Sequence, residues 1–158
     1  MIQLKKTVLC YIEDNNKYLM LHRTKKNQDL NEGKWLGIGG HIEANETPDE
    51  ALIREVLEET GLTLLNYTFN GIVEFINDNY KEIMYLYTSN SFEGLISECN
   101  EGELSWIDKD KILSLNLWDG DKIFLKKLFN NETNFYLRLY YDNNNFVRSD
   151  SDDLSKIY

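Results

Sequence analysis

The chain has 158 residues, of which 42% are hydrophobic, 13% aromatic and 28% charged, and its formal net charge is -10. This length and mixture predict one globular domain with its own core, and they exclude collagen-like, membrane-spanning and wholly disordered proteins. The excess of acidic residues argues against binding to nucleic acid polymers, because such binding draws on lysine and arginine. We therefore expect neither a nucleic acid polymer nor a membrane as a partner.

The beginning of the chain, from Met1 to Lys6, lacks the apolar stretch and cleavage site of a signal peptide. No apolar run approaches the ~20 residues that a membrane helix needs. We therefore expect a cytoplasmic protein. Cys10 and Cys99 are the only cysteines, too few for a disulfide framework, so we expect buried free thiols.

The first predicted element is a β-hairpin. Residues 6–12 and 17–21 are short runs of β-branched, aromatic and aliphatic side chains, separated by a polar turn. A polar loop over 24–34 then leads to residues 35–40, Trp-Leu-Gly-Ile-Gly-Gly. We expect these glycines to adopt positive φ angles and to let the backbone approach a ligand closely.

A helix is predicted next, over 48–60. Thr47 is the expected N-cap, Pro48 suits the first helical position, and Glu50 completes a capping box with Thr47. Gly61 is the expected C-cap. Both ends of this helix are therefore marked by the sequence.

The remainder of the chain alternates between strand and helix patterns. Strand patterns occupy 64–88, with a turn at 77–79, and then 95–97 and 104–107. A second amphipathic helix containing Ile123 to Phe129 is expected to begin near Asp119 or Asp121, before two C-terminal strands within about 134–149 and a frayed acidic end at 150–153. The sum is a single α+β domain over 1–158, with a sheet packed between helices.

Three glutamates, Glu55, Glu58 and Glu59, share one narrow stripe of the predicted helix over 48–60. Like charges at this spacing disfavour a helix slightly, so the cluster gains nothing unless a cation binds. Mg²⁺ prefers oxygen ligands and commonly uses one or two carboxylates together with waters and substrate phosphates. Taken alone, the stripe favours a merely solvated acidic face, because charge clusters on helices usually face solvent.

These glutamates stand within a longer pattern. Gly40 is followed by five residues and Glu46, and then by seven residues and a continuous run, Arg54-Glu55-Val56-Leu57-Glu58-Glu59-Thr60-Gly61-Leu62. The spacing resembles the Nudix box at every defining position. The resemblance extends from Lys6 to about Phe129 and is strongest to the MutT-like branch of the Nudix family, which sanitises oxidised purine nucleotides.

The resemblance implies a Nudix-type αβα sandwich with a mixed β-sheet and a loop-helix-loop catalytic element. It also implies hydrolysis of a nucleoside diphosphate linked to another moiety, with Mg²⁺ as cofactor and Mn²⁺ as a possible substitute. The family's metal ligands correspond to Glu55, Glu58 and Glu59, with the Gly39 carbonyl as a further ligand. The family's supporting ion pair corresponds to Glu46 and Arg54.

A fourth acidic residue is expected near the metal. Glu101 lies five residues before Trp106, a spacing similar to that of the metal ligand or general base of the oxidised-purine branch. Glu98 and Glu103 are alternatives, and all three are also compatible with an ordinary acidic loop. Glu58 or Glu59 could instead serve as the base, so Glu55, Glu58, Glu59 and Glu101 are all candidate catalytic residues.

Two further segments resemble the same branch: residues 35–40 and residues 117–121, Leu-Trp-Asp-Gly-Asp. Trp118 offers a face for stacking on a base, and Asp121 a carboxylate for the extra N–H of 8-oxoguanine. The alternatives are a core tryptophan and a helix N-cap at Asp119 or Asp121. Leu36 replaces an asparagine that contacts the base in the mammalian enzyme of this branch. The other predicted substrate contacts are Arg23, Gly40, Phe75 and Met84.

The sequence thus predicts Mg²⁺-dependent hydrolysis of a purine nucleoside triphosphate, with 8-oxo-dGTP as the preferred substrate, to a nucleoside monophosphate and pyrophosphate. A dinucleoside polyphosphate, a nucleotide sugar or ADP-ribose is the alternative substrate. A non-catalytic nucleotide sensor is a second alternative, which the complete set of box glutamates disfavours. The resemblance is compatible with a monomer or a homodimer.

Overall fold

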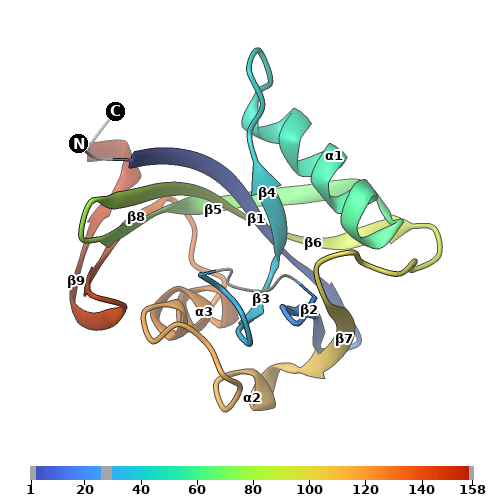
Figure 1. Cartoon of the computed structure of the whole chain (residues 1–158). Helices are drawn as coiled ribbons and strands as arrows, with labels where there is room; N and C mark the ends of the chain where they lie inside the picture. The colour runs from blue at the N-terminus through green and yellow to red at the C-terminus, as the bar shows by residue number, and fades with distance from the viewer. Residues whose placement is uncertain (1–2, 26–29, 157–158) are drawn as a thin grey trace.

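The computed structural model describes residues 3–25 and 30–156. The predicted polar loop over 24–34 is described only in part, because residues 26–29 lie outside these ranges. The elements follow one another along the chain as labelled in Figure 1. They are β1 (Gln3–Asp14), β2 (Lys17–His22), β3 (Trp35–Leu36), β4 (Ile38–His41), α1 (Pro48–Thr60), β5 (Thr63–Asn77), β6 (Tyr80–Glu93), β7 (Glu103–Asp108), α2 (Lys109–Ile112), α3 (Asp121–Phe129), β8 (Phe135–Asp142), β9 (Asn145–Asp153) and the 3-10 turn η1 (Leu154–Lys156).

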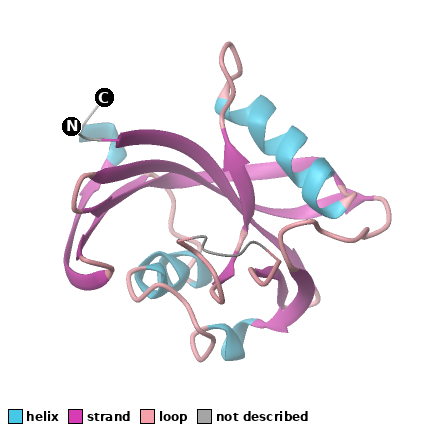
Figure 2. Ribbon diagram, in the orientation of Figure 1, coloured by secondary structure: helices cyan, strands magenta, loops and turns pink. Residues whose placement is uncertain are grey.

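The strands form a mixed sheet in the order β3-β2-β1-β6-β5-β8-β9, while β4 also pairs with β1 and β7 also pairs with β2. The β1–β6 and β5–β8 pairs are parallel and the other pairs are antiparallel. The predicted mixed sheet and the predicted hairpin of β1 and β2 are confirmed. The long strands β1, β6 and β5 lie side by side through the centre of the molecule (Figure 2).

Helices cover both faces of this sheet, as Figure 1 shows for α1 and α3. Because successive side chains of a strand point to opposite faces, Val8 and Cys10 of β1 pack in the core beneath α1. Leu9 and Tyr11 of the same strand pack in the second core, which includes Phe124 of α3. The two cores confirm the predicted sandwich of a sheet between helices.

Helix α1 begins and ends where the sequence predicted. The Thr47 hydroxyl accepts a hydrogen bond from the Glu50 backbone N–H, and the Glu50 carboxylate accepts one from the Thr47 N–H. Gly61 ends the helix with a φ of 82°, which glycine adopts at little cost. The hydroxyl of the buried Thr60 donates to the Val56 carbonyl and accepts from the Leu62 N–H, which links the helix to β5.

Three predictions about the outer elements need correction. Residues 95–97 form no strand; Leu95 is 89% exposed, and the segment lacks the strand neighbour that its composition would need. The acidic end at 150–153 is part of β9, which pairs with β8, and Arg138 of β8 binds Asp150 and Asp152. The C-terminal hairpin therefore extends to residue 153 instead of ending near 149. The short helix α2 was not predicted.

The two cysteines are buried and free, as expected, and burial raises the pKa of both thiols. None of the helices in the described part of the chain is long and apolar enough to cross a membrane.

Candidate active site

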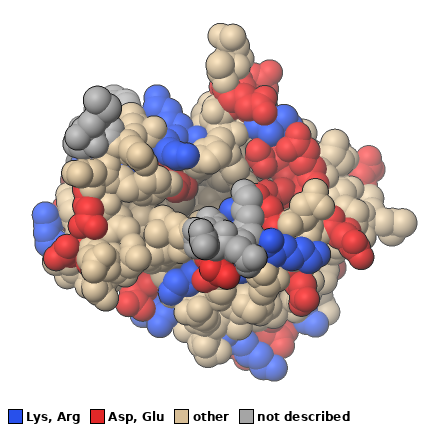
Figure 3. Space-filling model, in the orientation of Figure 1, with Lys and Arg blue, Asp and Glu red and all other residues tan. Residues whose placement is uncertain are grey.

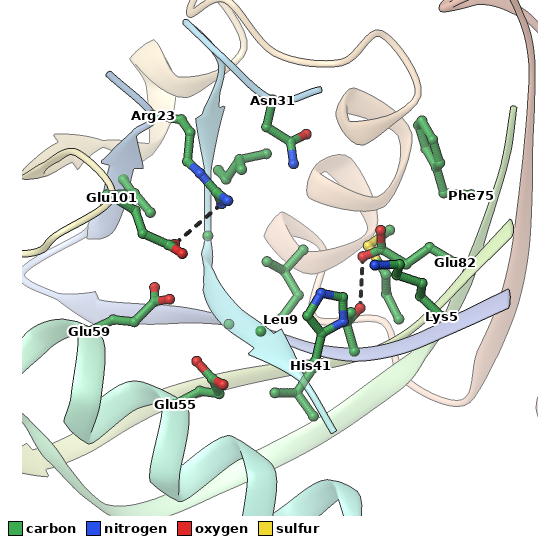
Figure 4. A pocket seen from close by; sticks show the side chains of 18 of the residues that line it. Lys5, Leu9, Arg23, Asn31, His41, Glu55, Glu59, Phe75, Glu82 and Glu101 are labelled. Carbon is green, nitrogen blue, oxygen red and sulfur yellow. Dashed lines mark hydrogen bonds and ion pairs between the residues drawn. The ribbon is translucent and has the colours of Figure 1, made fainter. Parts of the chain in front are cut away.

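A cavity of about 680 Å³ opens on the face shown in Figure 3, where acidic side chains gather along α1 beside the central hollow. Its wall is built by β1, β4, α1, β5 and β6, together with the segments around residues 23, 31, 101 and 118. The cavity has an acidic end beside α1 and an aromatic end beside α3. Figure 4 shows these two ends, with Glu55, Glu59 and Glu101 at one and Phe75 and Glu82 at the other.

The sequence-predicted site residues meet in this cavity. Its lining includes most of the predicted metal ligands, candidate catalytic residues and substrate contacts: Arg23, Leu36, Gly39, Gly40, Arg54, Glu55, Glu58, Glu59, Phe75, Met84, Glu101, Trp118 and Asp121. Of the predicted set, Glu46 alone is not among the described lining residues; it contacts the site through Arg54. The rivals Glu98 and Glu103 are not among the described lining residues either.

The glycines of residues 37–40 do not adopt the predicted positive φ angles. They lie at and between β3 and β4, where they permit close packing instead. A Cβ on Gly39 would lie 1.8 Å from the Val8 carbonyl oxygen of β1. A Cβ on Gly40 would lie 2.5 Å from the Glu55 carboxylate carbon. The glycine pair therefore brings β4 against both β1 and the acidic face of α1.

Arg54 ties this glycine strand to α1. Its Nε and Nη2 donate to the two oxygens of Glu46 at 2.7 and 2.8 Å, and Nη2 also donates to the His41 carbonyl at 3.0 Å. Its Nη1 donates to Glu55 at 2.8 Å and to Glu58 at 3.3 Å. The hydrogen bonds from Arg54 lower the pKa of Glu46 to about 2. The guanidinium thus fixes the orientation of the box loop and of two glutamates.

Glu59 lies at the bottom of the acidic end, and its Oε2 is buried with no hydrogen-bond partner among the described residues. Burial, followed by the negative charge and hydrogen bonding of Glu101, raises the pKa of Glu59 to about 9. Glu101 also forms an ion pair with Arg23, with 3.4 Å between Arg23 Nη1 and Glu101 Oε2 (Figure 4). Burial raises the pKa of Glu55 as well. Without a cation, this end of the cavity therefore favours a bound proton.

The chemistry of this end fits a hard divalent cation. Carboxylates supply oxygen ligands, and a buried carboxylate oxygen without a partner is costly unless something positive binds it. Among residues 3–25 and 30–156, however, no three His, Cys, Asp or Glu side chains form a preassembled metal cluster. The Arg54 contacts to Glu55 and Glu58 occupy two of the candidate ligands.

The aromatic end is built around Trp118, which is 6% exposed. Phe75 and Tyr141 pack edge-to-face against its ring, with centroids 5.1 and 5.4 Å away. Its Nε1 donates to the Asn31 side chain at 2.7 Å, and the Lys34 ammonium lies 5.1 Å from its ring centroid. Trp118 is thus a core side chain that also lines the cavity, and its stacking on a base stays a prediction.

Asp121 closes the same end of the cavity and is 5% exposed. The residue at the N-cap of α3 is Gly120, and no side chain caps the helix, so the N-cap interpretation of Asp119 or Asp121 is wrong. Burial, followed by the negative charge of Glu82, raises the pKa of Asp121 to about 8. Its carboxyl group is therefore protonated near neutral pH and can donate as well as accept a hydrogen bond.

The sequence did not single out several residues that line this cavity: Lys5, Thr7, Leu9, Asn31, Tyr80 and Glu82. Most lie on strands whose alternation identifies an inward face without revealing which inward positions border a cavity. One signal was present, because the polar residues Thr7 and Glu82 occupy inward positions of β1 and β6. A polar side chain at an inward position indicates a hydrogen-bonded role.

Known proteins resemble this chain in sequence and in structure. The NUDIX domain family matches residues 3–128. The Bacillus subtilis protein named uncharacterized Nudix hydrolase YvcI is 30% identical over 126 residues, 76% of each chain. The oxidized purine nucleoside triphosphate hydrolase of Danio rerio is 35% identical over 95 residues, which cover 59% of this chain and 61% of that enzyme. The crystal structure of a mutator MutT protein from Bacillus halodurans superposes with a TM-score of 0.84 at 25% identity, covering 94% of this chain and 97% of that one.

The mixed sheet between helices, the glutamate-bearing helix packed against a glycine strand beside a cavity, and the similarity to known proteins identify a hydrolase that acts on pyrophosphate bonds. The chain belongs to the Nudix family. Its structural neighbours are MutT proteins.

Proposed function

We propose that the protein hydrolyses a purine nucleoside triphosphate, with 8-oxo-dGTP as its preferred substrate, to a nucleoside monophosphate and pyrophosphate. The observation that carries the proposal is the single cavity with two ends, one lined by the box glutamates and the other by Trp118 and Asp121. The first end suits a cation and a phosphate chain, and the second suits a flat base with polar edges. Similarity to the Danio rerio enzyme supports the same substrate class.

At the acidic end, Glu55, Glu58 and Glu59 and the Gly39 carbonyl are the residues that would hold Mg²⁺, with Glu101 beside them. Mn²⁺ would fit the same oxygen ligands. A bound divalent cation would neutralise phosphate charge and lower the pKa of a coordinated water. Arg23 lines the cavity, where its guanidinium pairs with Glu101, and its positive charge would contact a phosphate oxygen. Arg54 holds Glu55 and Glu58 in orientation through Nη1.

The proton of the attacking water needs an acceptor, and the neighbouring carboxylates Glu59 and Glu101 are the candidates in this proposal. They lie together at the bottom of the acidic end, where the charge of Glu101 helps to raise the pKa of Glu59 to about 9. A cation would displace the proton that Glu59 otherwise retains, because a ligand carboxylate binds a cation in its ionised form. The pair would then accept the proton from water.

At the aromatic end, Trp118, Phe75 and Met84 would contact the faces of the base. Such contacts are worth ~1 to 3 kcal/mol for stacking on a single aromatic side chain. Asp121 would contact the imidazole edge, where 8-oxoguanine carries an N–H in place of the unprotonated nitrogen of guanine. Leu36 adds an apolar wall and contributes no hydrogen bond from its side chain. The discrimination against unoxidised guanine therefore depends on Asp121 in this proposal.

Product release from a substrate panel tests the proposal. The panel contains 8-oxo-dGTP, dGTP, ATP, a diadenosine polyphosphate, a nucleotide sugar and ADP-ribose, each with Mg²⁺, with Mn²⁺ and with chelator. We expect the highest kcat/KM for 8-oxo-dGTP and a loss of at least ~100-fold in Glu59→Gln, because one ligand and one proton acceptor are removed together. Glu103→Gln, a change outside the cavity lining, is the matched control.

The outcomes separate the alternatives. Preference for ADP-ribose, a nucleotide sugar or a diadenosine polyphosphate would retain the Nudix chemistry and overturn the purine triphosphate assignment. Activity that survives chelation, or that Glu59→Gln leaves intact, would overturn the assignment of the acidic end. Tight nucleotide binding without turnover in either metal would favour a nucleotide sensor.

A further inference from the structure

A carboxylate that the proposed mechanism does not use lies at the aromatic end of the cavity. Glu82 stands on β6, directly opposite Lys5 of β1 and Phe75 of β5 in the strand registers. All three residues line the cavity, and Figure 4 shows Glu82 between Phe75 and Lys5. Glu82 is thus on the same wall as the aromatic side chains and away from the box glutamates.

Two hydroxyl groups hold Glu82 in position. The Thr7 hydroxyl donates to Oε2 at 2.8 Å, and the Tyr80 hydroxyl donates to Oε1 at 2.7 Å. Each carboxylate oxygen has two lone pairs, so each retains one for a ligand. Because Thr7 is 6% exposed, its hydroxyl is fixed by the surrounding strands. The result is a rigid pair of acceptors, side by side.

The other polar group at this end is Asp121. Glu82 and Asp121 are close enough for the charge of Glu82 to raise the pKa of Asp121, after the larger effect of burial. Asp121 is therefore protonated near neutral pH, so its carboxyl group can donate as well as accept a hydrogen bond, whereas the Glu82 carboxylate only accepts. The apolar Phe75 and Met84 line the same cavity and suit the faces of a base.

We propose that Glu82 selects guanine-type bases by accepting hydrogen bonds from the ring N–H and the exocyclic amino group of their Watson–Crick edge. These two N–H groups are adjacent and parallel, which matches the two oxygens of one carboxylate. Hypoxanthine has the ring N–H without the amino group, and adenine places an acceptor nitrogen beside its amino group. The 8-oxo modification leaves this edge unchanged, so Glu82 would bind guanine and 8-oxoguanine alike. This inference deepens the proposed function, and it rests on that function only for the binding of the phosphate groups.

A purely structural role for Glu82 makes a different prediction. In that case Glu82 would serve only as a partner for Thr7, Tyr80 and the neighbouring Lys5, and its replacement would change the stability of the protein without changing base preference. The two roles are therefore distinguished by the ratio of the affinities for two bases, and not by the affinity for either base alone.

The test measures the dissociation constants of dGMP and dIMP by titration calorimetry, which requires no turnover. We expect the wild-type protein to bind dGMP about 10-fold or more tightly than dIMP, the effect of one hydrogen bond to a charged acceptor. Glu82→Gln should reduce this ratio to within about twofold, because the amide turns a donor toward the N–H groups of guanine. Glu93→Gln, an exposed change on the same strand, should retain the wild-type ratio.

A second variant guards against a fold defect in Glu82→Gln. Thr7→Val removes the hydroxyl that orients Oε2 of Glu82. It should lower the ratio of dGMP affinity to dIMP affinity severalfold without changing the contacts of either nucleotide's phosphate. Equal binding of the two nucleotides by the wild type, or an unchanged ratio in both variants, would overturn the role of Glu82. Discrimination that persists in a protein unable to hydrolyse any triphosphate would support Glu82 while overturning the proposed function.

Discussion

Replacing Asp121 with asparagine should stabilise the protein at neutral pH, even though it removes a residue of the proposed base site. Burial raises the pKa of Asp121 to about 8 in the folded chain, whereas an aspartate in the unfolded chain titrates near ~3.9. Between these values the folded state binds a proton that the unfolded state has lost. The free energy of unfolding therefore falls by about 1.4 kcal/mol per pH unit as the pH rises, or by up to about 4 kcal/mol between pH 4 and pH 7.

Asparagine has a similar shape and no charge, so this contribution disappears in Asp121→Asn. The variant should match the wild type near pH 4 and exceed it by up to about 4 kcal/mol at pH 7, with the difference levelling off above pH 8. Urea unfolding in chelator at several pH values measures this difference. Asp119→Asn, at an exposed neighbouring position, is the control. A difference that stays constant with pH, or a variant less stable than the wild type at pH 7, would refute the reasoning.

Three further predictions concern the acidic end. The pKa of Glu59 is raised to about 9, so its carboxyl group must lose a proton to bind a cation. The affinity for Mg²⁺ should therefore rise with pH up to about 9. Calorimetric titrations near pH ~7.5, in buffers of different ionisation enthalpy, should detect the released proton. Gly40→Ala puts a methyl group 2.5 Å from the Glu55 carboxylate carbon, so kcat/KM should fall ~10-fold or more while circular dichroism still reports a folded chain; an unchanged kcat/KM would contradict the packing argument. In Arg54→Lys the lysine cannot donate to both oxygens of Glu46, so both thermal stability and Mg²⁺ affinity should decrease. A decrease in only one of them would mean that Arg54 does not couple the loop of Glu46 to α1.

Helix α1 was predicted to the residue because its signals are local. The capping box of Thr47 and Glu50, the proline at 48 and the glycine at 61 act within one turn of each helix end, so no tertiary information is needed. The acidic end of the cavity followed from the same helix, since helical spacing fixes the relation of its glutamates. Glu101 could be predicted only from the family resemblance, because the position of a loop residue does not follow from helix or strand periodicity.

The aromatic end could be predicted only in part. Trp118 and Asp121 were identified by resemblance to a family segment, whereas Glu82 was missed because a strand pattern does not reveal which partner strand lies opposite. The strand wrongly predicted at 95–97 failed for the same reason, since β-propensity without a neighbouring strand does not form a sheet. The positive φ angles predicted for Gly39 and Gly40 are wrong. These positions require glycine because a Cβ would collide with the Val8 carbonyl and the Glu55 carboxylate.

The family match ends at residue 128, but the aromatic end of the cavity does not. Tyr141 of β8 packs against both Phe75 and Trp118, and its hydroxyl accepts a hydrogen bond from the Gly120 N–H at 2.7 Å, one residue before Asp121. The C-terminal hairpin thus supports the aromatic end of the cavity. A change in this segment, which lies outside the matched family region, would therefore alter the aromatic end of the cavity while leaving the glutamates of α1 in place.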